Sequence, residues 1–397
     1  MGERPRWLVA TTEYAGLTPY TGGIGTHYAA LLPALVRQGV GVDLVVFSDG
    51  PAIPAADLDG VRLLAYERTD RMPRAFALAH RALRVRRAYR HGDYDRVFLP
   101  EWIGLGAFLP VDAPLLTNLA TGIRLAHEVS RLRLRDLPLA DRPAVLLQRA
   151  MEARQIRRSA GVIAISQAML AWTTSAFPRL PRAAVVRNCI DLDRVRAAST
   201  AAVPEGWPPG GDPIVLFLGR SERRKGVVDA VSAFGALHER MPHVRLVLAG
   251  AGGDARFEPT RADLLASLPA TARPLVTWLG HVPGDRLFAA IRAASVAMCP
   301  SRWEGFGNVA LEAKTIGTPL VVTTGSGFDD FCVDGVDCLM VPPAAPAPLA
   351  VALERLLTDR GLATALAEAA QERVGDFAPD PVAADLIAAA DGLLDRG

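Results

Sequence analysis

The fold is decided by residues 296–316, which read VAMCPSRWEGFGNVALEAKTI. A short apolar run, 296–300, is followed by a glycine-flanked loop, and the apolar residues from Asn308 onward recur with a helical period. This order predicts a buried strand, a functional loop and a helix, with Asn308 as N-cap and Glu312 one turn further in. Carboxylates at Glu304 and Glu312 beside loop amides suit a ligand that joins hydroxyl groups to a phosphate.

The same alternation of strand-length apolar runs and helical periods extends over the whole chain. The first series of expected strands comprises residues 7–10, 41–47, 61–65, 96–99, 114–118, 161–165 and 184–187, and the second comprises 214–218, 244–249, 276–279, 296–300, 319–323 and 338–341. Helical periods lie between them, for example at 25–38, 145–159, 227–240, 287–294 and 308–316. Two such series predict two doubly wound α/β domains with parallel sheets. Residues 196–213, rich in Ala, Pro and Gly, predict the linker.

Composition is that of a globular protein long enough for two cores. The 397 residues are 50% hydrophobic and 22% charged, with a formal net charge of +2. These values exclude a disordered, collagen-like or disulfide-stapled chain and argue against a nucleic-acid partner. The four cysteines form no Cys-x-x-Cys pair, which favours a reduced, cytoplasmic protein. No apolar run approaches the ~18 residues of a membrane span, and the run 7–10 is too short for a signal peptide.

Lysine is almost absent from the sequence. Of the 44 basic residues only Lys225 and Lys314 are lysines, a bias typical of a GC-rich bacterial genome. Lys225 comes five residues after Arg220, which directly follows the apolar run 214–218. Arginine binds phosphate through a bidentate fork and lysine through a compact charge, so the two together suit a diphosphate. The alternative is a solvated basic loop.

Two further glycine-rich loops follow expected strands. Gly22 and Gly23 precede the first helical period, where glycine lets the backbone approach an anion and the helix start offers N–H groups. A structural turn explains these residues nearly as well. The loop 324–330 is also glycine-rich, and a structural role is favoured there.

Several of these motifs occur together in one enzyme family. They are Gly22-Gly23, Asn188-Cys189-Ile190-Asp191, Arg220 with Lys225-Gly226, Gly280-His281-Val282-Pro283, Glu304 with Glu312, Asp334-Gly335 and Val341-Pro342-Pro343. With these landmarks in order, the chain resembles a retaining glycosyltransferase of the GT-B fold, in family 4 (glycosyl transferases group 1). The resemblance spans nearly the whole chain and is loose from about residue 52 to 160.

The resemblance implies two Rossmann-like doubly wound domains that face an interdomain cleft. Residues 1–190 would form the acceptor-side domain, onto which a C-terminal helix at about 376–397 returns. Residues 191–375 would bind the nucleotide-sugar.

The resemblance also implies a role for each motif. Arg220, Lys225 and Glu304 would be the catalytic residues, with Arg220 and Lys225 on the diphosphate and Glu304 on the hydroxyls of the transferred sugar. Glu312 would bind the ribose hydroxyls. The remaining donor-binding positions would be the amides of Gly22 and Gly23, the backbone near His281 and Val282 for the base, and the loop residues Gly305, Phe306, Gly307, Asn308 and Val309.

One position departs from the family pattern. The family often places a histidine just after the strand that here reads 114–118, and Ala120 takes that place. Either Asn118, Thr121 or His127 substitutes for it, or donor binding manages without it. The acceptor-binding candidates are Glu13, Tyr14, Glu101, Trp102, Asn118 and the stretch from Arg124 to His127. A structural role for Trp102 is an equal alternative.

The function expected on these grounds is retaining transfer of a sugar from a UDP- or GDP-sugar, UDP being favoured, to a hydroxyl of a small soluble acceptor. An antibiotic, an aminocyclitol or another secondary metabolite would be such an acceptor. Neither metal nor cofactor is expected. The metal-binding pattern of the other glycosyltransferase fold, Asp-x-Asp, occurs three times, but none of the three follows an expected strand in the context of a phosphate loop. One alternative is a lipid- or polysaccharide-directed enzyme at a membrane surface, suggested by the basic helical stretch 81–90. The others are a nucleotide-sugar epimerase and a non-catalytic nucleotide-sugar-binding protein.

Overall fold

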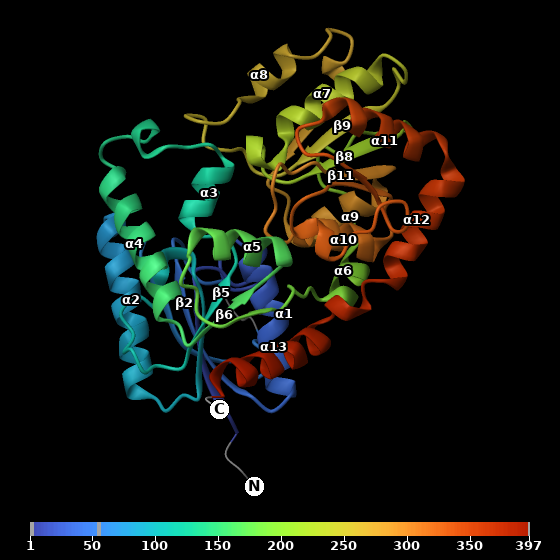
Figure 1. Cartoon of the computed structure of the whole chain (residues 1–397). Coiled ribbons are helices and arrows are strands. Elements are labelled where there is room, and N and C mark those ends of the chain that lie inside the picture. Colours follow the sequence, from blue (N-terminus) through green and yellow to red (C-terminus); the bar gives the residue numbers. More distant parts are fainter. Residues whose placement is uncertain (1–3, 54–56, 396–397) are drawn as a thin grey trace. The chain divides into compact units, whose positions relative to one another are not determined.

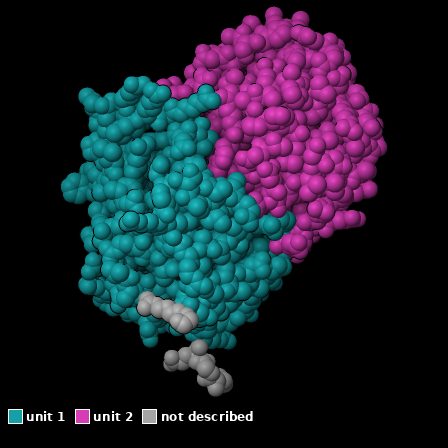
Figure 2. Space-filling model, viewed as in Figure 1, with its two compact units in different colours: residues 1–190, 377–397 teal, residues 191–376 magenta. Residues whose placement is uncertain are grey.

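The computed structural model describes residues 4–53 and 57–395. The chain divides into two compact units, shown in different colours in Figure 2. Unit 1 comprises Met1–Ile190 and Phe377–Gly397, and unit 2 comprises Asp191–Asp376. The domain borders expected from the sequence, at 190 and about 376, fall at these positions.

Unit 1 is built on a seven-stranded parallel sheet of order β3-β2-β1-β4-β5-β6-β7. Its strands are β1 (Arg6–Thr11), β2 (Gly41–Ser48), β3 (Arg62–Arg68), β4 (Arg96–Pro100), β5 (Leu115–Leu119), β6 (Gly161–Ala164) and β7 (Ala183–Val185). The central strand β1 pairs with β2 on one side and β4 on the other, so that Val9 lies opposite both Leu44 and Phe98. Its continuous apolar run is explained by burial on both faces.

Helices cover both faces of this sheet (Figure 1). They are α1 (Gly23–Arg37), α2 (Arg74–His91), α3 (Ile123–Val129), α4 (Arg142–Arg158), α5 (Gln167–Ala176) and α13 (Pro379–Leu394), with short 3₁₀ turns η1 (Trp102–Gly104) and η2 (Leu134–Asp136). One core contains Tyr28 of α1 and Leu386 of α13. A second core contains Val85 of α2 and Met151 of α4. The last helix therefore completes the first unit, as the resemblance implied.

Unit 2 contains a six-stranded parallel sheet of order β10-β9-β8-β11-β12-β13. Its strands are β8 (Ile214–Leu218), β9 (Arg245–Ala249), β10 (Val276–Gly280), β11 (Val296–Cys299), β12 (Leu320–Thr323) and β13 (Leu339–Val341). Its helices are α6 (Leu192–Ala198), α7 (Val227–His238), α8 (Arg261–Ala266), α9 (Gly284–Ala293), α10 (Asn308–Ile316), α11 (Pro346–Thr358) and α12 (Arg360–Glu372), and its 3₁₀ turns include η3 (Arg223–Lys225), η4 (Arg273–Leu275) and η5 (Gly327–Asp330), with η6 (Gly375–Phe377) at the border. Phe217 and Phe234 lie at the centre of its core.

The structure corrects two local expectations. Asn308 is the first residue of α10, and the N-cap is Gly307. Gly307 has φ 105°, and a Cβ there would lie 2.3 Å from the Phe328 ring, so this cap position requires glycine. The expected linker at 196–213 begins inside α6, which ends at Ala198. Among the described residues, no helix combines the length and the apolar character needed to cross a bilayer.

Candidate functional site

Two loops of unit 2 meet at the carboxyl ends of neighbouring strands. Strands β8 and β11 pair in parallel, so the loops that follow them emerge at the same edge of the sheet. Gly226 in the first loop has φ 77°, and a Cβ there would lie 1.8 Å from the carbonyl oxygen of Pro300. The Arg302 N–H donates to the Arg224 carbonyl at 2.8 Å. Glycine at 226 therefore lets the basic loop lie against the loop that carries Glu304.

Lys225 and Glu304 form an ion pair between these loops. Their side chains are 17% and 12% exposed, and the Ser301 hydroxyl donates to the same Glu304 oxygen at 3.2 Å. Burial raises the pKa of Glu304, but the cations Lys225 and Arg224 outweigh burial and hold that pKa below its ordinary value. Glu304 is therefore an oriented, ionised carboxylate that can accept hydrogen bonds from ligand hydroxyls.

Glu312 on α10 is a buried carboxylate. It is 6% exposed, and burial raises its pKa to about 7. Within the described part of the chain its side chain makes no hydrogen bond and no ion pair. A buried carboxylate is costly without hydrogen-bond donors. A ligand that offers hydroxyl groups would supply them.

The basic loop is ordered by an acidic residue that sequence analysis missed. The buried Glu222 pairs with Arg220 at 3.0 Å and with Arg224 at 2.8 Å. The Arg220 side chain is 45% exposed. Glu222 thus holds two guanidinium groups beside Lys225, and the run Arg-Ser-Glu-Arg-Arg-Lys was the available signal.

The Glu304 loop is supported from behind by the loop 324–330. The Gly327 N–H donates to the Glu304 carbonyl at 2.9 Å, and the Phe306 and Phe331 rings pack with centroids 4.9 Å apart. Phe306 is 1% exposed, so its ring supports the loop. Gly305 and Asn308 are buried in the same loop, and Val309 is half-buried. The favoured structural role of loop 324–330 agrees with these contacts.

The base-binding candidates follow β10. His281 is exposed and Val282 is 8% exposed. In the sheet order, β10 lies two strands from β8, so these residues share the carboxyl edge with the basic loop.

Lys314, the second lysine, has a structural position. Its side chain is fully buried, pairs with Asp337 at 2.9 Å and donates to the Phe331 carbonyl. Arg373 also pairs with Asp337, at 2.9 Å. In the described residues, Cys332, Asp337 and Cys338 are the one set whose ligand atoms lie within 4.8 Å of one another. Because two cations already neutralise Asp337, its carboxylate is a poor metal ligand.

In unit 1 the glycine loop is occupied by a carboxylate of the same chain. Gly22 is the N-cap of α1, and its N–H donates to the Glu13 side chain. Burial raises the pKa of Glu13, which the amides of Gly22 and Gly25 partly offset. Glu13 therefore fills the position where a helix start would attract an anion. Neighbouring Tyr14 is 3% exposed and belongs to the apolar core, which gives it a structural position.

Ala120, at the position where the family often has a histidine, makes a hydrogen bond through its backbone. The Ala120 N–H donates at 2.7 Å to Glu101, which is 3% exposed and whose pKa burial raises to about 8. Glu152, which sequence analysis missed, accepts from the N–H groups of Ile103 at 3.0 Å and Ile123 at 2.8 Å. Burial raises its pKa to about 7. The two carboxylates tie together the loops that follow β4 and β5.

A small cavity of about 80 Å³ lies beside these carboxylates. Its charged and aromatic lining comprises Glu101, Arg124, Arg149, Glu152, Arg157, Trp172 and Phe177. Arg149 also donates to His127 Nδ1 at 3.0 Å, which places His127 at this cluster. Burial, followed by the charges of Arg149 and Arg74, lowers the His127 pKa.

Two other acceptor candidates have structural contacts. Asn118 is buried and donates to the Tyr28 hydroxyl at 3.3 Å. Trp102 packs against the core formed by α2 and α4. Sequence analysis missed Arg149 and Arg157 because they lie on α4, far along the chain from β4 and β5.

Relatives of known class match almost the whole chain. The family described as Glycosyl transferases group 1 matches residues 203–373, and that described as Glycosyltransferase Family 4 matches residues 21–194. Glycogen synthase of Mycobacterium tuberculosis (strain ATCC 25618 / H37Rv) is 30% identical over 94% of this chain and 91% of its own length. D-inositol 3-phosphate glycosyltransferase of Salinispora arenicola (strain CNS-205) is 29% identical over 77% and 70%.

Solved structures show the same architecture. Sucrose-phosphate synthase from Thermosynechococcus elongatus superposes with a TM-score of 0.74 at 22% identity, covering 98% of this chain and 99% of that one. Anabaena HepE, solved in complex with UDP-glucose, has a TM-score of 0.66 at 16% identity, covering 96% and 99%. The chain therefore belongs to the glycosyltransferases of group 1, family 4, and has their GT-B fold of two Rossmann-like domains.

Proposed function

We propose that this glycosyltransferase transfers a sugar, with retention and without a metal, from a nucleotide-diphosphate sugar to a hydroxyl of a small soluble acceptor. The observation that carries the proposal is the ion pair between Lys225 and Glu304, because Glu304 lies on the same loop-and-helix segment as the buried Glu312, which makes no hydrogen bond or ion pair in the described part of the chain. A nucleotide-sugar has phosphate groups that can bind the Lys225 ammonium and hydroxyl groups that can donate to the carboxylates of Glu304 and Glu312. UDP is the favoured nucleotide, and the UDP-glucose complex of the structurally similar HepE supports it.

The proposed reaction is a front-face displacement in which no side chain acts as nucleophile. The bond from the anomeric carbon to the diphosphate oxygen breaks, and the acceptor oxygen bonds to that carbon on the same face. The acceptor proton moves to the departing phosphate oxygen. Lys225 and Arg220 stabilise the charge that develops on the leaving diphosphate. Because an ammonium has three donors, Lys225 can bind phosphate while it still orients Glu304.

The acceptor is proposed to bind near the small cavity of unit 1. Arg124, Arg149 and Arg157 line it, whereas Glu152 is already bonded to backbone amides. These guanidinium groups favour a compact acceptor with several hydroxyls or an anionic substituent. The name of the relative D-inositol 3-phosphate glycosyltransferase, which describes an acceptor of that kind, is in keeping with this choice.

A second candidate is a lipid-directed enzyme. Helix α2 exposes Phe76, at 73%, and Leu83, at 53%, on a helix rich in arginine. Such a face suits the surface of an anionic membrane. Co-sedimentation with anionic vesicles that is lost in the Phe76→Ser, Leu83→Ser double variant would favour this candidate over the soluble acceptor.

The test of the proposed function is the anomeric configuration of the product. The purified enzyme is incubated with UDP-glucose or GDP-mannose and a panel of cyclitols and glycosides, with EDTA present, and proton NMR follows the reaction. An α-linked product from these α-linked donors, formed at an undiminished rate in EDTA, is the expected result. A β-linked product or a requirement for added metal would overturn the proposed mechanism. Release of an epimerised nucleotide-sugar would indicate the epimerase alternative.

A further inference from the structure

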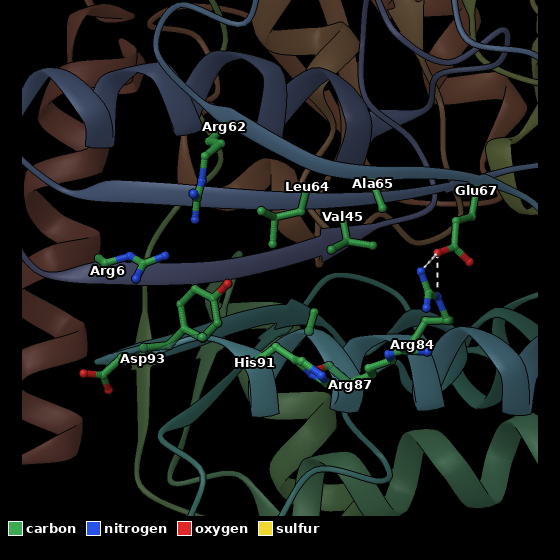
Figure 3. Close-up of a pocket in the computed structure, with 13 residues that line it drawn as sticks. Arg6, Val45, Arg62, Leu64, Ala65, Glu67, Arg84, Arg87, His91 and Asp93 are labelled. Carbon is green, nitrogen blue, oxygen red and sulfur yellow. Dashed lines mark hydrogen bonds and ion pairs between the residues drawn. The ribbon is translucent and has the colours of Figure 1, made fainter.

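A second and larger cavity lies in unit 1, beside the edge strand β3 and helix α2 (Figure 3). Its volume is about 490 Å³, within the range of small-molecule sites. Arg6 and Arg62 are the first residues of strands β1 and β3, and Asp93 lies three residues before the start of β4. These residues mark the amino edge of the sheet, whereas Glu101 and Ala120 lie at the carboxyl ends of their strands. The cavity is therefore separate from the candidate site.

Basic residues outnumber acidic ones in the lining. The charged and titratable residues that line it are Arg6, Arg62, Glu67, Arg84, Arg87, His91 and Asp93. Figure 3 shows Arg6 and Arg62 toward one end, Arg84 with Glu67 toward the other and Arg87 near Arg84, with Val45, Leu64 and Ala65 between the two ends and His91 below Leu64 and Val45. The cavity thus has two basic ends joined by an apolar floor.

At the first end, two guanidinium groups share one carboxylate. Asp43 is 4% exposed and accepts from Arg62 at 2.6 Å, from Arg6 at 2.8 Å and from the Tyr94 hydroxyl at 2.9 Å. This buried carboxylate fixes both arginines in place and neutralises one of their two charges. Of Arg6, Arg62 and Asp43, one positive charge is left, and Asp93, which also lines this end, lies near Arg6.

The second end contains one arginine side chain with spare donors. Arg84 is paired with Glu67, but the Arg87 side chain makes no hydrogen bond or ion pair in the described part of the chain. His91 donates through Nδ1 to the Arg87 carbonyl at 2.8 Å, so its Nε2 is an acceptor in the neutral ring and becomes a donor only in the imidazolium. Arg87 is therefore available to an anion, and His91 adds a donor when its ring is doubly protonated.

We propose that this cavity binds a compact molecule carrying two phosphate groups, one at Arg6 and Arg62 and the other at Arg87 and His91. Arginine forks match the geometry of phosphate oxygens. Arg62 and Glu67 are five residues apart on β3, which is about 16 Å along a strand. The apolar floor accommodates the body of the ligand.

The test is calorimetric titration with fructose 1,6-bisphosphate in phosphate-free buffer. We expect saturable binding that Arg87→Ala weakens at least ~10-fold, about 1.4 kcal/mol of binding free energy. Arg90→Ala is the matched control, because Arg90 is exposed on the same helix but does not line the cavity. Lys225→Ala should leave this binding unchanged, which separates the cavity from the proposed donor site and keeps the test independent of the proposed function.

A second arm identifies the source of the phosphates. Vesicles containing cardiolipin, a lipid with two phosphates, are compared with phosphatidylcholine vesicles in co-sedimentation with wild type, Arg87→Ala and Arg90→Ala. Binding that Arg87→Ala weakens and Arg90→Ala does not, in either experiment, supports the site. The experiment in which this difference appears tells whether the ligand is a free bisphosphate or a lipid headgroup. Absence of binding in both arms, equal weakening by Arg87→Ala and Arg90→Ala, or loss of bisphosphate binding in Lys225→Ala would overturn it.

Discussion

Lys225 has a charge environment that explains why lysine occurs there in a chain whose basic residues are, apart from Lys314, otherwise arginines. Its ammonium lies on Glu304, and the Arg220 and Arg224 guanidinium groups are held by Glu222 in the same loop. A compact ammonium with three donors can contact a carboxylate and a phosphate together, which a planar guanidinium does less well. The proposed chemistry therefore depends on the side chain of Lys225, and substitution of that residue tests it.

Lys225→Ala should lower turnover at least ~100-fold, since removing one donor that stabilises developing negative charge costs about 3 kcal/mol. Arg223→Ala is the control, because Arg223 is an exposed cation of the same loop. The measurement is the steady-state kcat of both variants and of wild type. Equal kcat in Lys225→Ala and wild type would remove Lys225 from the catalytic residues.

Glu312 predicts a pH dependence of nucleotide affinity. Burial raises its pKa to about 7, so it is largely protonated below pH 7 and ionised above it. The ionised form accepts hydroxyl hydrogen bonds more strongly, so affinity should rise from pH 6 to pH 8. The native state holds this proton more tightly than the unfolded state does, so the stability linked to Glu312 is present at low pH and is lost as pH rises toward 7.

The pH effect is measured as the Kd for UDP in wild type and Glu312→Gln. The difference between the two proteins should grow from pH 6 to pH 8. A constant ratio of the two Kd values across this range would show that ionisation of Glu312 plays no part in binding.

At the scale of elements, the loops of unit 2 depend on glycine and on a buried ion pair. Helix α10 carries Glu312 and, two residues further on, Lys314, and Lys314 anchors the segment that contains Phe331 and Asp337. That segment in turn packs against the Glu304 loop through Phe306. The packing of this segment therefore fixes the backbone of the Glu304 loop, which the proposed ligand would contact.

Lys314→Met should lower the free energy of unfolding of unit 2 by about 3 kcal/mol or more, because it leaves a buried carboxylate with one partner fewer. Arg373→Ala removes the other partner of Asp337 from a side chain that is 51% exposed, and should cost about 1 kcal/mol or less. Chemical denaturation of the two variants compares them. Equal costs would contradict a structural role specific to Lys314.

Gly226→Ala should lower both the melting temperature and turnover, the latter by ~10-fold or more, because a Cβ would collide with the Pro300 carbonyl and part the two loops. Gly252→Ala is the matched control in a nearby loop, where a Cβ meets nothing within 4 Å. Thermal unfolding and initial rates of both variants are the measurements. Wild-type turnover in Gly226→Ala would show that the close approach of the loops is dispensable.

At the scale of the whole molecule, the sequence is sufficient to predict the sheets but only part of the candidate site. All thirteen expected strands form. Most of them are continuous apolar runs because they are buried on both faces, whereas the edge strands β3 and β7 are partly exposed. The short, Ala-rich helix α6 escaped prediction because its composition resembles that of a linker. Lys225, Glu304 and Glu312 stood out because each lies in a contiguous motif. Glu152, Arg149 and the bisphosphate cavity did not, because the fold assembles them from distant segments.

The most direct test of the proposed donor site is a thermal-shift screen of the whole chain against UDP, GDP, ADP and dTDP and their common sugars, with and without EDTA. We predict that one nucleotide, most readily UDP, raises the melting temperature equally in both buffers and that Glu312→Ala abolishes the shift. A shift that requires metal, a shift retained in Glu312→Ala, or no shift with any nucleotide would contradict the proposed binding of a nucleotide-sugar at Lys225, Glu304 and Glu312.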